Sequence, residues 1–278
     1  MTEKPIVMPD PDAFALGYLP ASAQRFDGTV FADVKETVIE EVPVSLEWNG
    51  TRHIVMMATP TDLEAFAVGF SITEGIIDSA NQILAVDVVP TASGVGILIL
   101  IADELVSRIA DRERLGGGNS SCGLCGIQDM QEATRMPRHV SGNQIFSPQA
   151  ITRAMRELPQ FQPIGTRTGA AHAAAFALPS GEIVQACEDA GRHNALDKLV
   201  GKLALQGTNP SDGFLALTSR ASFEMVQKAA AAGFPMLCAI SAPTGLAARM
   251  AHEAGITLVA FARDERFVCF AHPHRIVL

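Results

Sequence analysis

The last hundred residues of the chain repeat one pattern, and this repeat constrains the fold more than any other sequence feature. Short apolar runs at 214–218, 236–240 and 256–261 alternate with two helix-like segments, 223–232 and 245–254, each followed by glycine. Strands without polar alternation are buried on both faces, and strands that alternate with helices form parallel pairs. The repeat therefore predicts a sheet with parallel pairs that is covered on both faces by helices.

Polar residues follow each of these three apolar runs. Because the carboxyl ends of parallel strands meet at one edge of a sheet, we expect a rim there, made of Arg220, Ser222, Ser241, Thr244 and Arg263. Arginines and helix N-termini together suit an anionic ligand, most simply phosphates. The alternative is that these residues only cap helices, with Thr244 as an N-cap. The sequence contains no phosphate-binding loop or dinucleotide fingerprint, so this inference rests on architecture.

A charged segment precedes the repeat. A helix is predicted over 147–158, and strands at 168–177 and 183–186 are joined by a turn. The next twelve residues, 187–198, include seven polar or charged side chains, and a helix begins there near Asn194. A single histidine at a bend is usually structural. Histidine, arginine and carboxylates gathered together at a strand exit indicate a functional site.

The first half of the chain has the pattern of a mixed α/β domain. Residues 1–35 contain scattered prolines and no sustained period, so we predict a flexible arm. Strand-forming residues flank Asn49 and Gly50, a dipeptide typical of a two-residue hairpin turn. The segments predicted as strands are 37–47, 52–57, 83–89 and 95–102, with a helix from Leu63 to Phe70. We therefore place a mixed α/β domain at 36–145 and a second domain at 146–278.

Composition excludes several classes of protein. The formal net charge is -9 and no cluster of lysine and arginine is visible, which argues against nucleic-acid binding. The longest aliphatic run, 97–102, is far shorter than the roughly 20 residues of a membrane span. The chain opens without a signal peptide and contains five cysteines, an odd number. We therefore expect a cytoplasmic protein with free thiols.

A glycine-rich segment at 116–126 carries two of those thiols, Cys122 and Cys125, and ends the first predicted domain. Glycine, asparagine and serine favour turns, so this segment should hold neither a helix nor a strand. A Cys-x-x-Cys pair has three ordinary explanations. It is half of a zinc site, a dithiol and disulfide couple, or a thiolate that attacks or carries another group.

The sequence context favours the third explanation. A structural zinc needs four ligands, which Cys187 and His193 could complete, but the remaining cysteines, Cys238 and Cys269, are isolated in apolar runs. A thioredoxin-type couple would stand between a strand and a helix, whereas this pair follows three glycines. The remaining interpretation is a sulfur nucleophile on a swinging loop, with zinc left open.

Five strings, in order along nearly the whole chain, resemble the formate dehydrogenase accessory sulfurtransferase family, FdhD/NarQ. They are 119–126, Thr168 and Gly169 with His172, 188–198, 219–226 and 241–244. The sequence departs from the family at Ala171, where members often have glycine. The resemblance implies an α/β fold in which 146–278 is a three-layer α/β/α domain similar to cytidine deaminases. It also implies a homodimer.

The same resemblance implies an activity and a set of residues. Members are sulfurtransferases that accept sulfur from a cysteine desulfurase as a persulfide. They pass it to the molybdenum bis(molybdopterin guanine dinucleotide) cofactor of formate dehydrogenase, whose catalytic subunit is a further partner. Cys122 is then the persulfide-bearing residue and Cys125 its partner, with no metal ligand. The cofactor segment falls on Phe261, Ala262, Arg263, Asp264, Glu265 and Arg266. To these residues we add Arg192 and Arg220, because they lie at predicted strand exits.

Two rival interpretations follow from the same residues. A zinc-dependent deaminase needs His-x-Glu and later Pro-Cys-x-x-Cys, whereas Ala174 stands two residues after His172 and Ser121 precedes Cys122. The other rival is a non-enzymatic chaperone that only holds the cofactor, with a structural zinc at the cysteine pair.

Overall fold

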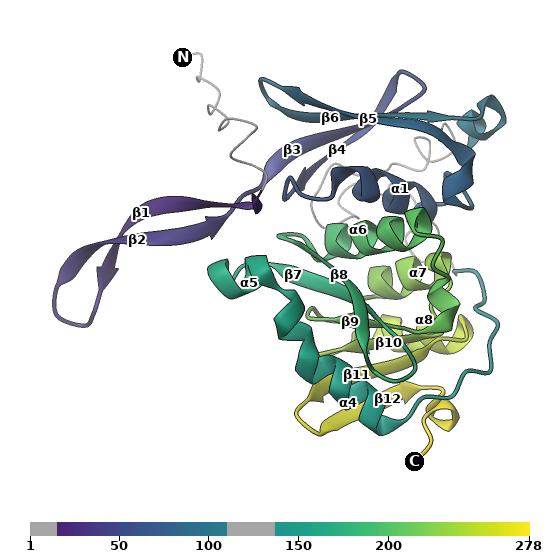
Figure 1. Cartoon of the computed structure of the whole chain (residues 1–278). Coiled ribbons are helices and arrows are strands. Elements are labelled where there is room, and N and C mark those ends of the chain that lie inside the picture. The colour runs from purple at the N-terminus through teal and green to yellow at the C-terminus, as the bar shows by residue number, and fades with distance from the viewer. Residues whose placement is uncertain (1–15, 110–136) are drawn as a thin grey trace.

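The computed structural model describes residues 16–109 and 137–278, which form a projecting hairpin and two packed domains (Figure 1). Residues 1–15 and 110–136 lie outside the described residues, and with them the cysteine segment 116–126. Within the described ranges, no helix is both long enough and apolar enough to span a membrane.

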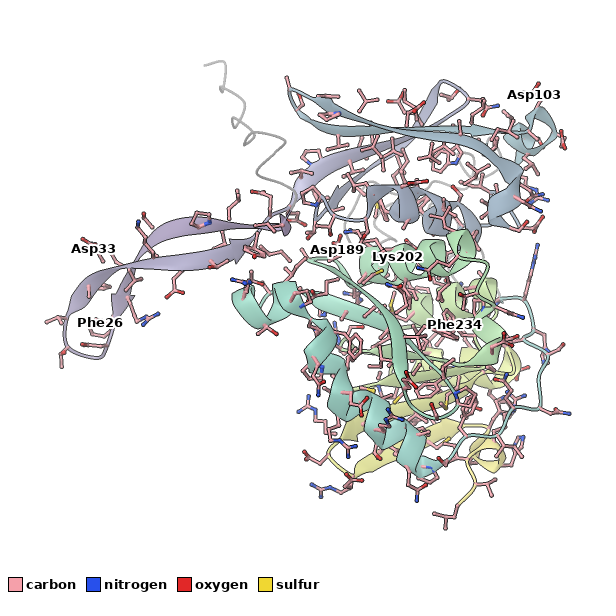
Figure 2. All side chains as sticks on the ribbon, viewed as in Figure 1. Phe26, Asp33, Asp103, Asp189, Lys202 and Phe234 are labelled. Atoms are coloured by element: carbon pink, nitrogen blue, oxygen red, sulfur yellow. The ribbon has the colours of Figure 1, made fainter. Side chains whose placement is uncertain are left out.

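The hairpin consists of β1 (Tyr18–Phe26) and β2 (Phe31–Ile39), which pair antiparallel with Phe26 opposite Phe31. Figure 2 shows Phe26 at its outer end, away from both domains. The Asp27 carboxylate closes the turn by accepting hydrogen bonds from the hydroxyl and backbone N–H of Thr29 and the N–H of Val30. These bonds lower the pKa of Asp27 to about 2.

The prediction of a flexible arm over 1–35 is therefore wrong for the residues from Tyr18 onward. Most side chains of both strands are exposed, so the hairpin has no buried face. Without a buried face its sequence shows no alternation of apolar and polar residues, which is the pattern that predicts a strand. The local signal was Asp27 followed by Gly28, whose φ is 101°. At its base the hairpin meets the second domain, where the Arg167 guanidinium lies 5.3 Å from the centroid of the Tyr18 ring.

Among the described residues, the first domain contains a four-stranded sheet and the helix α1 that packs on it, as predicted. Its elements are β3 (Val42–Trp48), β4 (Thr51–Ala58), α1 (Leu63–Thr73), β5 (Ile83–Thr91) and β6 (Gly94–Ile101). The strand order is β4-β3-β6-β5, and only β3 and β6 pair in parallel. Asn49 and Gly50 have φ of 48° and 80°, so the predicted two-residue turn is confirmed. The buried face of the sheet packs on α1, whose Ser71 hydroxyl accepts a bond from the Trp48 indole.

The second domain is a six-stranded sheet between two helical layers, which confirms the predicted α/β/α fold class. Its helices are α4 (Pro148–Glu157), α5 (Pro163–Thr168), α6 (Arg192–Leu205), α7 (Phe223–Ala232) and α8 (Gly245–Glu253). Its strands are β7 (His172–Ala177), β8 (Ile183–Asp189), β9 (Phe214–Leu217), β10 (Met236–Ala239), β11 (Thr257–Arg263) and β12 (Arg266–Ala271). One buried cluster lies under α6, α7 and α8, and a second lies under α4 on the opposite face.

The strand order of this sheet is β12-β11-β10-β9-β7-β8. The three strands of the predicted repeat, β9, β10 and β11, pair in parallel, while β7, β8 and β12 are antiparallel to their neighbours. Sequence reasoning did not predict β12. It also started α6 two residues late, and it began the domain at 146, whereas Val140 already belongs to this core and donates to the carbonyl of Ala254.

The two domains meet where α1 lies against α6 (Figure 1). Glycines allow the two backbones to approach closely. A Cβ atom on Gly69 would lie 1.7 Å from the carbonyl oxygen of Asp197, and one on Gly201 would lie 1.8 Å from that of Ala65. The middle of α6 is therefore positioned by the first domain as well as by its own sheet.

Candidate functional site

Residues from six segments of the second domain meet at one edge of its sheet. The strands β9, β10 and β11 end at this edge, as predicted. Because β7 runs antiparallel to β9, its first residue, His172, also lies there, paired with Asp189 at the end of β8. We call this edge the carboxyl rim, and define it as His172, Asp189, 192–193, 218–224, 240–244 and 261–266.

Backbone hydrogen bonds join the strand exits of the rim. Ala221 donates to the carbonyl of Ala242 and accepts from the N–H of Thr244, at 3.2 and 3.0 Å. Phe261 donates to the carbonyl of Ser241 at 3.1 Å, and the Arg263 guanidinium donates through Nε to the carbonyl of Ile240 at 3.2 Å. The predicted rim residues are thus brought to one edge.

The two arginines proposed at these exits, Arg220 and Arg263, are exposed, and so is the ring of Phe261, which has a positive φ of 53°. The cofactor segment inferred from the family resemblance ends β11, forms the turn at Asp264 and Glu265, and opens β12. Of its residues only Ala262 is buried. An exposed aromatic ring beside cationic side chains can stack on a base and bind phosphates.

Helix capping explains only part of the rim. The Thr244 hydroxyl accepts a bond from the N–H of Ala247 and caps α8, as expected if the rim residues only cap helices. Ser222 stands at the N-cap of α7 without making a side-chain cap, and α6 follows Gly191, which has no side chain. Two helix N-termini at the rim therefore lack a capping side chain, and their N–H groups and dipoles favour negative charge.

A buried histidine and a glutamate meet between these two helix N-termini. The Nε2 atom of His193, on α6, is 2.9 Å from an oxygen of Glu224, on α7. The Arg192 guanidinium is 3.7 Å from the same oxygen. Burial, together with the nearby charge of Arg192, lowers the pKa of His172, which therefore carries little charge at neutral pH.

Other charges of the 187–198 segment serve the interface between the domains. Lys198 and Asp189 form a wholly buried ion pair at 2.7 Å. Asp189 also accepts bonds from the N–H groups of Thr59 and Gly191, and Lys198 donates to the carbonyl of Thr59. Figure 2 shows Asp189 at the level where the two domains meet. The pair fixes the loop before α1 to the start of α6.

A second buried pair crosses the same interface. Asp197 lies 2.9 Å from Lys228 and accepts a bond from the Thr73 hydroxyl of α1, while Lys228 also reaches Glu74. Burial raises the pKa of Asp197 against the opposing effect of Lys228. Most charges of the 187–198 segment, which the sequence placed in a functional site, therefore hold the two domains together. Of this segment, Arg192 and His193 remain for the carboxyl rim.

Glu188 has a further structural role, because its carboxylate accepts bonds from the N–H groups of Ile164 and Gly165 at the start of α5. Burial raises its pKa. The sequence could not assign these partners. Glu224 lies in the string 219–226 that resembles the family, but the sequence assigned it no role. Lys228 was predicted only as a residue of the helix 223–232.

The thiols of the described residues are poorly placed for nucleophilic chemistry. Cys187 and Cys238 are buried and Cys269 is partly buried. Burial raises the pKa of Cys187 to about 12 and raises those of Cys238 and Cys269. Cys122 and Cys125 lie outside the described residues. Within 16–109 and 137–278, no group of three or more histidine, cysteine or acidic side chains could hold a metal ion.

Comparisons with known proteins agree with this architecture. The FdhD/NarQ family model matches residues 39–277. The sulfur carrier protein FdhD of Bordetella bronchiseptica is 44% identical over 245 residues, covering 88% of this chain and 89% of that protein. The sulfur carrier protein FdhD of Variovorax paradoxus is 45% identical over 244 residues, covering 88% of each.

A solved structure shares the fold. It is a chain from Desulfotalea psychrophila, assigned provisionally as a formate dehydrogenase accessory protein. It superposes with a TM-score of 0.71 at 23% identity, covering 94% of this chain and 99% of that chain.

Proposed function

The chain belongs to the FdhD/NarQ family, and from this premise we propose that it is a sulfur carrier. It accepts sulfur as a persulfide from a cysteine desulfurase. It passes that sulfur to the molybdenum bis(molybdopterin guanine dinucleotide) cofactor, which is its substrate, on the way to the catalytic subunit of formate dehydrogenase. The observation that carries the proposal is the pair Cys122 and Cys125 in a chain 44% identical to a sulfur carrier protein.

Loading requires one thiolate. The thiolate of Cys122 attacks the outer sulfur of the donor persulfide, a new S–S bond forms on Cys122, and the donor cysteine leaves as a thiolate. Burial suppresses ionisation of Cys187 and Cys238, so neither competes for the sulfur. Cys187 also packs inside an apolar cluster, which argues against the alternative of a zinc ion shared between it and the cysteine pair.

Discharge uses the second cysteine. The thiolate of Cys125 attacks the inner sulfur of the Cys122 persulfide, a disulfide forms between the two residues, and the outer sulfur leaves as sulfide for the molybdenum. The two electrons that reduce the sulfane sulfur come from the two cysteines. A cellular dithiol then reduces the disulfide and restores the carrier.

The carboxyl rim is the proposed binding surface for the guanine dinucleotide. Its segment 261–266 offers an exposed ring, exposed arginines and the carboxylates of Asp264 and Glu265, which could accept bonds from a guanine edge. Arg192 and Arg220 extend the positive charge toward α6 and α7, whose N-termini lack capping side chains. We further propose that the protein acts as a homodimer in the cytoplasm.

Replacing Arg263 by alanine is expected to weaken the binding of guanosine diphosphate about tenfold, since one charge-assisted hydrogen bond to phosphate is lost. Titration calorimetry measures the affinity. The matched control is Arg153→Ala, which removes an arginine from α4, where it pairs with Glu157. An affinity that is the same in both variants would remove Arg263 from the site.

Mass spectrometry and metal analysis of the full-length protein test the proposal against the chaperone alternative. After incubation with a cysteine desulfurase and cysteine, the protein should gain about 32 Da, the mass of one sulfur atom, on Cys122. A protein that holds about one zinc per chain and gains no sulfur would instead be a cofactor-binding chaperone.

A further inference from the structure

The first turns of α6 and α7 face each other at the carboxyl rim, with the ring of His193 between them. The ring belongs to the second residue of α6, and its Nε2 atom reaches Glu224, the second residue of α7. His193 is only 1% exposed. The other ring nitrogen, Nδ1, is buried as well, and we call the space beside it, between the two helix N-termini, the gap.

That second nitrogen has no partner in the part of the chain that the structure describes. The carboxylate of Glu224 can only accept a hydrogen bond, so Nε2 of His193 carries a proton. Nδ1 is buried and bonds to none of the described residues, and neither does the buried Nε of Arg192. Buried polar atoms are almost always paired, so two unpaired nitrogens on consecutive residues at the start of α6, followed by the unpaired amide oxygen of Asn194, point to a ligand.

The charges around the gap favour an anion. Arg192 contributes a guanidinium group from α6, and the N-termini of α6 and α7 have no capping side chain. His172, on β7, carries little charge, and Asp189, on β8, is neutralised by Lys198. Among the described groups named here, the opposing charge is that of Glu224, which is 2.9 Å from His193 and 3.7 Å from Arg192.

We propose that this gap is a phosphate subsite for the guanine dinucleotide, in which His193 donates through Nδ1 and Arg192 through its guanidinium. This inference rests on the proposed function and adds to it a subsite outside the 261–266 segment. To donate through both nitrogens, the ring carries a proton on each of them while the phosphate is bound. Glu224 then stabilises the imidazolium, as a carboxylate commonly orients a histidine.

Titration calorimetry with guanosine diphosphate tests the subsite in the full-length protein. His193→Gln should bind guanosine diphosphate about 10- to 100-fold more weakly than the wild-type protein, since a charge-assisted bond is lost. The control His252→Gln changes a histidine on α8 that stacks on His272 and should leave the affinity unchanged.

Guanosine and inorganic pyrophosphate identify the part of the ligand that is bound. A loss of affinity in His193→Gln for pyrophosphate but not for guanosine would support the subsite. A loss of affinity for guanosine alone would contradict it, because the base would then be the group that His193 contacts.

Nitrogen NMR of the wild-type protein keeps the test independent of folding in the variant. The Nδ1 signal of His193 should shift as guanosine diphosphate saturates the protein, and the saturated ring should give the signals of an imidazolium. A ring whose signals do not respond while the nucleotide binds would overturn the subsite and leave the proposed function intact. If the wild-type protein binds no guanosine diphosphate, both the subsite and the nucleotide part of the proposed function are wrong, whereas sulfur loading on Cys122 is measured separately.

Discussion

The Cys122→Ser protein should gain no sulfur from a cysteine desulfurase and should support no formate dehydrogenase activity in cells that lack the native protein. A thiol with an ordinary pKa of about 8.5 is partly ionised at neutral pH, whereas a serine hydroxyl is not. Only the thiolate attacks a persulfide sulfur at a useful rate. The loss should therefore be complete rather than graded.

Intact-mass spectrometry after incubation with the desulfurase and cysteine makes the measurement. The wild-type protein should gain about 32 Da and Cys122→Ser should gain nothing. The matched control is Cys269→Ser on β12, where the thiol donates to the carbonyl of Ala271 and a hydroxyl can do the same. Formate dehydrogenase activity supported by Cys122→Ser would refute the sulfur-carrier proposal.

Replacing Cys125 by alanine should leave sulfur loading intact and impair sulfur delivery. Cys122 still loads, so the gain of about 32 Da remains, but no neighbouring thiolate attacks the persulfide. Single-turnover delivery of sulfur should then fall by about tenfold or more, since an intramolecular thiol is replaced by whatever dithiol the solution supplies. Delivery at the wild-type rate would remove Cys125 from the discharge step.

The sequence predicted the second domain better than the hairpin, for a physical reason. In the repeat from β9 to β11, apolar strands alternate with helices that end at Gly233 and Gly255. The hydrophobic pattern and the helix-ending glycines therefore indicate the same element boundaries. The strands β1 and β2 bury almost nothing, so their sequence carries no period to detect. The partner of β12 is β11, and its register shifts twice, which local patterns do not encode.

The candidate site shows the same division. Topology alone placed Arg220 and Arg263 at one edge, because parallel strands end together. The charges of 187–198 were interpreted as a site, although several of them find partners far along the chain. Asp197 pairs with Lys228, and Asp189 accepts a bond from Thr59 in the other domain. A sequence shows that charges are present, but only the packed interface shows that they neutralise each other.

Replacing Lys198 by methionine should lower the free energy of unfolding by about 3–5 kcal/mol, because it leaves a buried carboxylate without its cation. Both side chains of the pair with Asp189 are fully buried, and the ammonium group also satisfies the carbonyl of Thr59. Urea denaturation followed by circular dichroism measures the change. Methionine retains most of the volume, so a cavity contributes little to the loss.

The matched control is Lys202→Met, one turn further along α6. Lys202 also pairs with a residue of the first domain, Asp62, at 2.9 Å, but the two side chains are 30% and 31% exposed. An exposed pair contributes at most about 1 kcal/mol. Equal losses in the two variants would show that burial of the pair does not set its contribution.

The double variant Asp189→Asn with Lys198→Met separates the charge from the packing. Without a carboxylate there is no unpaired charge to bury, so the double variant should be more stable than Lys198→Met alone. Asp189 also accepts a bond from the N–H of Gly191, immediately before Arg192 and His193. Any loss of guanosine diphosphate affinity in Lys198→Met that the double variant reverses would therefore show that the interdomain pair positions the start of α6 for its ligand.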